Sequence, residues 1–149
     1  MANWKRIQSG YIGGAQATDA TSSTAKFPLG IIMQAKDCDY STDYGVGEFI
    51  YLKGVASTAV GSVVTFNRDD HSTALLAANA KGPVAVAMSA NVANQYGWYQ
   101  IRGKAVAKVL ASFADNADVY ATSTAGSVDD AVVSGDVIVG AKSASAIDT

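Results

Sequence analysis

From Phe27 onward, short apolar runs alternate with turn-forming residues, a pattern typical of β-strands. The run at residues 73–79 is too short for periodicity to decide between a helical turn and a strand. Because strands recur at intervals of about 8–12 residues, we expect an all-β fold, a single small β-barrel or jelly-roll-like sandwich. Besides a short apolar run at 28–36, strands are expected over residues 48–55, 62–67, 84–89, 118–122 and 137–141.

A hairpin is expected where Tyr96–Ile101 and Lys104–Leu110 flank the dipeptide Arg102-Gly103. A two-residue connection that contains glycine, set between alternating runs, is a hairpin signal. Residues 104–110 alternate with period two, so their lysines are expected on one face and their alanines on the other.

The N-terminal residues 1–26 differ from the domain predicted over residues 27–149. Residues 13–24 are small and mostly polar with no period, and such a segment buries too little to order itself. We interpret residues 1–26 as an extended, flexible arm that either orders on a partner or docks back on its own domain. Its apolar and basic tip holds the candidate partner-binding residues Trp4, Lys5, Arg6, Ile7, Tyr11 and Ile12.

Composition favours a protein that works through its surface. Apolar residues make up 49% of the chain and charged residues 16%, below the usual level of about 25%. Some apolar surface is therefore expected to face partners. The net charge of −2 disfavours nucleic acid and anionic lipid, and no apolar run is long enough to span a membrane. The single cysteine, Cys38, excludes an internal disulfide and fits a reducing cytosol.

Few side chains are suited to catalysis. His71 is the only histidine and lies in a hydrophilic turn, so we interpret it as a solvated turn residue. One histidine and one cysteine do not make a structural zinc site. Asp37, Asp39 and Asp43 share one loop, but without EF-hand spacing they are interpreted as loop-solvating residues rather than calcium ligands. We therefore predict a non-catalytic protein without a cofactor.

An aromatic set, Tyr96, Trp98 and Tyr99, lies beside Arg102 and has the chemistry to stack on bases or sugars. In a strand Tyr96 and Trp98 share a face and Tyr99 points the other way, so at most two form one platform. The preferred interpretation is one face in the core and one at an interface, which makes Trp98 a further candidate for partner contact.

Three stretches resemble the capsid decoration (cement) proteins of tailed bacteriophages. They are GEFIYLKGVASTAVGSVVTF (47–66), GPVAVAMSANVANQYGWYQIRGKAVAKV (82–109) and DVYATSTAGSVDDAVVSGDVI (118–138). The resemblance implies a small β domain, a homodimer or homotrimer, that sits outside an HK97-type shell and bridges major capsid protein subunits. It further implies a virion protein made in the host bacterial cytoplasm.

Function is then expected to be adhesion through many weak contacts on a repetitive shell. The alternative is a carbohydrate- or receptor-binding β module of a phage tail or fibre, which would use Tyr96, Trp98 and Tyr99. An enzyme is disfavoured by the shortage of titratable groups.

Overall fold

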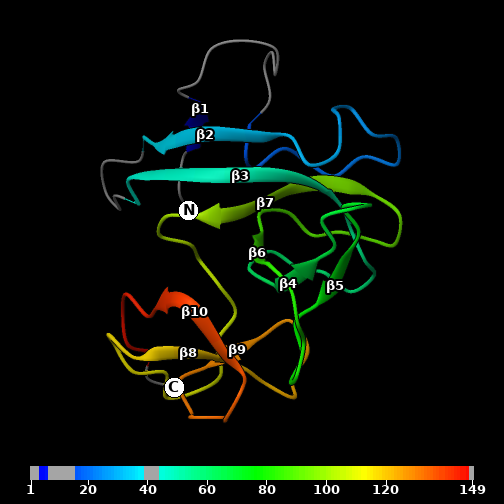
Figure 1. Ribbon diagram of the computed structural model, residues 1–149. Helices are drawn as coiled ribbons and strands as arrows, with labels where there is room; N and C mark the ends of the chain where they lie inside the picture. The colour runs from blue at the N-terminus through cyan, green and yellow to red at the C-terminus, as the bar shows by residue number, and fades with distance from the viewer. Residues whose placement is uncertain (1–3, 7–15, 39–43, 148–149) are drawn as a thin grey trace.

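The computed structural model describes residues 4–6, 16–38 and 44–147, and this part of the chain is all-β with no helix. Ten strands form two antiparallel sheets, one above the other in the view of Figure 1. The strands are β1 Trp4–Arg6, β2 Ile32–Asp37, β3 Val46–Lys53, β4 Val63–Phe66, β5 Thr73–Leu75, β6 Val84–Ala87, β7 Tyr96–Arg102, β8 Asp118–Ala121, β9 Val128–Asp129 and β10 Val137–Lys142. Consistently, the described residues include no helix able to cross a membrane.

The larger sheet has the strand order β1-β2-β3-β7-β6-β4-β5, and the smaller sheet has the order β10-β8-β9. The larger sheet curls, because the end of β3 meets the residue before β5 through a bridge between Lys53 and Ser72. The sheet does not close into a barrel, so the sandwich-like form of the expected fold is the one observed.

Strands β3 and β7 lie in the middle of the larger sheet and are buried on both faces. Phe49 and Tyr51 of β3 pack with Trp98 of β7 in one core cluster. Ile50 and Leu52 of β3 point the opposite way and join a second cluster. A central strand that is covered on both faces needs apolar residues at successive positions, which explains the run from Phe49 to Leu52.

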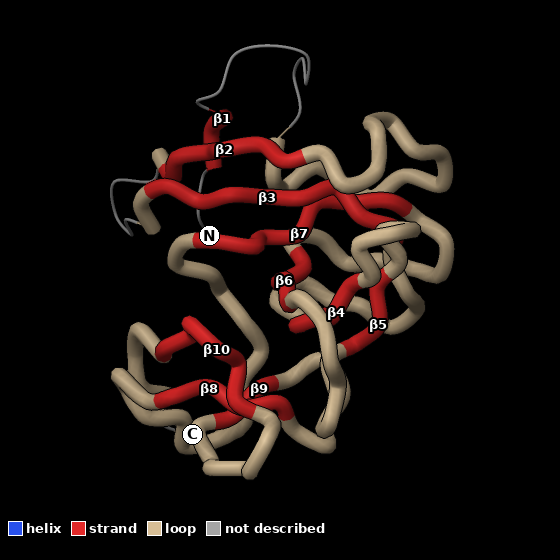
Figure 2. Tube along the Cα trace, viewed as in Figure 1, coloured by secondary structure: helices blue, strands red, loops and turns tan. Residues whose placement is uncertain are grey.

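A third core cluster joins the two sheets. Val63 and Leu76 from the larger sheet region pack with Phe113, Val119 and Val128 on the side of the smaller sheet. The sheets are therefore two parts of one folded unit, linked by the chain that leaves β7 and descends to β8 (Figure 2).

Most expected strands are confirmed, and the ambiguous run at 73–79 contributes the short strand β5. The expected hairpin is wrong: residues 104–110 do not pair with β7. Both edges of β7 are already occupied, by β3 on one side and β6 on the other. The segment stays extended, with its backbone bonded to Gly61 and Val128 instead, and its exposure still alternates with period two.

The described parts of the N-terminal segment dock on their own domain, the second of the two expected alternatives. β1 pairs with β2, placing Trp4 opposite Asp37. Trp4 is 4% exposed and contacts Phe49 edge-on, with the ring centroids 5.0 Å apart. Further along, Ser22 exchanges two backbone hydrogen bonds with Tyr96.

Candidate interaction surface

Half of the exposed large apolar side chains of the described chain lie in its C-terminal part. Val139 is 92% exposed and Val132 is 81% exposed. Three more lie within fifteen residues of them: Val133, Val137 and Ile147. Isolated exposed valines are ordinary, but exposed apolar side chains that gather on one contiguous surface mark an interaction site.

Three of these side chains, Val137, Val139 and Ile147, line a cleft of about 870 Å³ between the two sheets. The cleft is lined by β6, the connection that leaves β7, and the smaller sheet with β10. Its exposed apolar lining comprises Val106, Val137, Val139 and Ile147, and its buried lining includes Phe113 and Val119. This volume falls within the range of about 300–1,000 Å³ that small-molecule pockets have.

The shape of β10 brings its valines to the mouth of the cleft. β10 pairs with β8 at its two ends, Val137 with Tyr120 and Lys142 with Asp118, and the register shifts between these pairs. Residues 138–141 therefore bulge out of the ladder, with Gly140 at a φ of 82°. A bulge of this kind re-aims side chains at the rim of a sheet.

The start of β10 is fixed by a buried carboxylate. Asp136 is 7% exposed, and its Oδ1 accepts a hydrogen bond of 2.8 Å from the backbone N–H of Asn79. Asn79 has a φ of 62°, so the carboxylate stabilises a turn that an L-residue adopts reluctantly. This contact ties the loop before β6 to the start of β10.

The rim of the cleft is cationic. Among the described residues that line it are four cationic side chains, Lys81, Arg102, Lys104 and Lys142, against one carboxylate, the inward-facing Asp136. Lys142 pairs with Asp118 at 2.6 Å and Arg102 with Glu48 at 3.9 Å. Within the described chain, Lys81 and Lys104 have no carboxylate partner within 4.0 Å, although Lys104 lies over the ring of Tyr44 at 5.3 Å.

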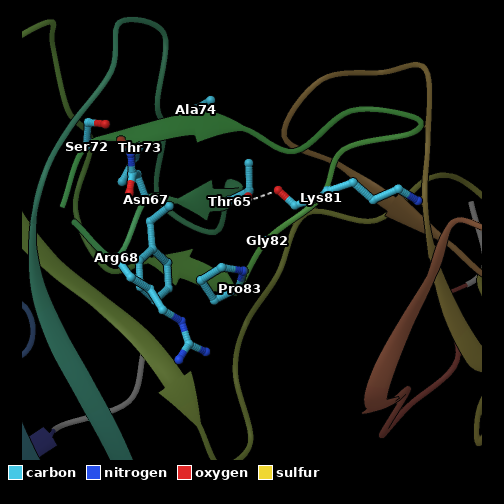
Figure 3. A pocket seen from close by; sticks show the side chains of 10 residues that line it. Thr65, Asn67, Arg68, Ser72, Thr73, Ala74, Lys81, Gly82 and Pro83 are labelled. Carbon is cyan, nitrogen blue, oxygen red and sulfur yellow. Dashed lines mark hydrogen bonds between the residues drawn. The ribbon is translucent and has the colours of Figure 1, made fainter. Parts of the chain in front are cut away.

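A second, smaller hollow of about 470 Å³ lies beside β4 and β5 (Figure 3). Thr65 donates a hydrogen bond of 3.4 Å to the Lys81 carbonyl at its edge. Figure 3 shows the side chains of Arg68 and Lys81 extending in different directions, away from Ser72 and Thr73. Because its polar groups do not converge on one point, this hollow has no evident ligand chemistry.

The residues singled out in the arm divide into two sets. Lys5 is exposed and Arg6 half-buried, whereas Trp4 is buried in the core. A partner contact by Trp4 would require β1 to leave the sheet. The other three, Ile7, Tyr11 and Ile12, lie outside the described residues.

The aromatic residues of β7 do not form a surface platform. Trp98 is 2% exposed and packs against Tyr51, with centroids 5.1 Å apart, and Tyr99 is 1% exposed on the opposite face. Tyr96 alone is half-buried. In this fold Trp98 therefore has no surface through which to contact a partner, and the stacking site for sugars has no exposed pair of rings.

The other singled-out groups show no convergent chemistry. His71 lies in a turn with a φ of 57°, packed against Gly30. Asp37 is buried, and its Oδ2 accepts a hydrogen bond from Tyr44 at 3.2 Å, while Asp39 and Asp43 lie outside the described residues. In the part of the chain that the structure describes, no group of three or more metal-ligating side chains comes together.

Sequence reasoning missed the cleft because its lining comes from distant parts of the chain. The run Val137–Ala141 has the composition of an ordinary core strand, so nothing local signals that Val139 is exposed. The one available signal was global: few charges relative to apolar residues, which implied apolar surface without locating it.

Comparison of the chain with protein-family models, curated proteins and solved structures finds no match. The fold and the cleft thus define the class: an all-β, sandwich-like protein with an exposed apolar surface between its sheets.

Proposed function

We propose that this chain is a structural virion protein that binds the outer surface of an HK97-type phage capsid. It stabilises the shell by bridging major capsid protein subunits and acts as a homodimer or homotrimer. The single observation that carries the proposal is the gathering of exposed valines around the cleft. The sequence resemblance to decoration proteins supplies the identity of the partner.

The physical argument is that exposed apolar surface is unfavourable until a partner covers it. Burial releases about 25 cal/mol for each Å² of apolar surface removed from water. A specific interface usually buries about 1,200–2,000 Å², so the cleft and its surroundings would form the centre of a contact rather than all of it. On a repetitive shell, several such contacts by one oligomer raise the effective affinity without strengthening any one of them.

Charge supports a protein partner over nucleic acid. The net charge of −2 gives no general attraction for phosphate, and the cationic side chains at the cleft are few and mixed with valines. This arrangement is typical of a protein interface, in which an apolar centre has a polar rim.

Cosedimentation with undecorated heads of the phage that encodes the chain tests the proposal. The full chain is expected to sediment with the heads and to raise the temperature at which they release their genome. The double variant Val106→Ser, Val139→Ser removes apolar surface at the cleft and is expected to sediment at least about tenfold less well, equivalent to about 1.4 kcal/mol.

The matched control is Val92→Ser, at a position that is 56% exposed and does not line the cleft. It is expected to sediment like the unchanged protein. Failure of the unchanged protein to sediment with heads contradicts the proposal, and so does binding of a glycan panel in place of heads.

A further inference from the structure

We infer that the cleft between the two sheets binds an extended segment of another protein that alternates carboxylate and apolar side chains. The inference deepens the proposed function and rests on it for the partner's location, since the segment would belong to a capsid subunit. Three observations carry it: the exposed valines, the unpaired outer edge of β10 in the described sheet, and the cationic rim.

The apolar part of the segment is specified by the lining. Val106 and Val139 are 59% and 92% exposed at the mouth, and Phe113 lies deeper, at 5% exposed. Aliphatic side chains of an incoming segment would cover the two valines and remove them from water. A wholly polar ligand would leave both valines exposed and so has no advantage here.

The extended conformation is specified by β10. This strand is the outer strand of the smaller sheet, and residues 138–141 lie outside its ladder with β8. The other edge of β10 carries no partner strand in the described sheet, and an extended chain adds to such an edge in complexes formed by strand addition. In such complexes main-chain hydrogen bonds supply affinity and alternate side chains supply specificity.

The acidic character is specified by the rim. Lys81 and Lys104 have no carboxylate partner within 4.0 Å in the described chain, and the lone carboxylate of the lining, Asp136, is directed inward at Asn79. Carboxylates on the segment would complement these lysines and guide its approach. A second copy of this chain docked through the same face would instead bring two cationic rims together, which disfavours self-association there.

The test uses the full ¹⁵N-labelled chain and three end-blocked eight-residue peptides: alternating Asp and Leu, alternating Lys and Leu, and alternating Asp and Ser. The Asp–Leu peptide is expected to shift amide resonances of residues that line the cleft, Val106 and Val139 among them. The other two peptides are expected to bind at least about fivefold more weakly, and raising the salt concentration should weaken the Asp–Leu complex.

Two double variants test whether the peptide is attracted by the lysines at the rim of the cleft or by the net charge of the chain. Lys81→Gln with Lys104→Gln is expected to weaken binding of the Asp–Leu peptide about threefold to tenfold. Lys26→Gln with Lys36→Gln makes the same change in net charge before and within β2, at exposed positions that do not line the cleft. This control is expected to bind like the unchanged chain.

Four results would overturn the inference: equal binding of the Lys–Leu peptide, resonance shifts away from the cleft, no shift at millimolar peptide, or the same shifts on concentrating the chain alone. The last would show that a second copy occupies the face. A chain that binds the peptide at the cleft but does not sediment with heads would contradict the proposed function and leave this inference standing.

Discussion

Trp98 is the largest of the fully buried side chains, and its surroundings show how the larger sheet is held together. Its ring lies 5.1 Å from that of Tyr51 and 5.6 Å from that of Phe27, which reaches the sheet from the loop before β2. Tilted ring pairs at these separations add to the stability gained by burial alone. The residue thus fastens the segment before β2 to the centre of the sheet.

We expect Trp98→Ala to lower the free energy of unfolding by about 3–5 kcal/mol, because it leaves a cavity among packed rings. The control Val139→Ala changes a side chain that is 92% exposed and should cost less than about 0.5 kcal/mol. Urea unfolding followed by circular dichroism measures both. A small loss for Trp98→Ala would mean that the ring is accessible to partners.

Tyr99 and Tyr51 make stability depend on pH in the alkaline range. Burial raises the pKa of both hydroxyls above the ordinary value of 10.0, and the hydrogen bond that Tyr99 shares with Asn91 partly offsets the rise. Above pH 10 the unfolded chain releases these protons before the folded chain does. Stability is therefore complete below about pH 10 and falls as the pH rises above it.

The variant Tyr99→Phe should lose stability less steeply above pH 10, while at neutral pH it should be weaker by about 0.5–1.5 kcal/mol because Asn91 loses a partner. Urea midpoints measured between pH 7 and pH 11 give both slopes. An alkaline slope as steep as that of the unchanged chain would show that Tyr99 does not contribute.

Among the elements, the turn after β7 decides where the chain goes next. Gly103 has a φ of 94°, and a Cβ added there would meet the Val46 carbonyl oxygen at 2.6 Å. The Gln100 side chain donates hydrogen bonds of 3.1 Å to the carbonyls of Arg102 and Lys104 and so stabilises the turn. Together these contacts direct the chain away from β7 and toward the smaller sheet.

Gly103→Ala is expected to cost about 2–4 kcal/mol, the sum of left-handed backbone strain and a steric clash. Gly135→Ala is the matched control, because Gly135 also has a positive φ, 87°, but has open space around it. Backbone strain alone should make its cost about 1 kcal/mol. Equal losses in thermal or urea unfolding would contradict the role given to the clash.

The sequence predicts an element well when the residues of that element alone determine its structure. The runs at β3, β6 and β7 were recognised because a central strand carries its apolar residues in its own sequence. The alternating exposure of residues 104–110 was also predicted, but the segments to which their backbone is hydrogen-bonded were not. The choice between β7 and the strands near Gly61 and Val128 depends on which sheet edges other strands have already filled.

The candidate site was less predictable than the strands. Lys81, Val106 and Val139 come together only after both sheets have formed, and no spacing in the chain marks them as neighbours. The aromatic run at β7 gave the stronger local signal, yet its large rings serve the core. Apolar residues have the same sequence signature whether they face a core or a partner, so burial had to come from the structure.

At the scale of the whole molecule, the cleft lies between the two sheets, so its shape depends on their staying packed together. The sheets stay packed together at all urea concentrations below the global transition only if they unfold as one cooperative unit. Phe113, 5% exposed, lies in the cluster that joins Val63 and Leu76 to the smaller sheet, and it also lines the cleft. Both tryptophans, Trp4 and Trp98, belong to the larger sheet, so their fluorescence reports on that sheet alone.

Phe113→Ala is therefore a test of coupling between the sheets. If they fold cooperatively, the loss of about 3–5 kcal/mol should appear in tryptophan fluorescence as a urea midpoint lowered by about 1–5 M, for a slope of about 1–3 kcal/mol/M. Val132→Ala, 81% exposed and also on the side of the smaller sheet, should leave that midpoint unchanged. If instead the tryptophan transition stays in place while amide signals of β8 vanish at lower urea, the sheets are independent, and the cleft would open without unfolding the larger sheet.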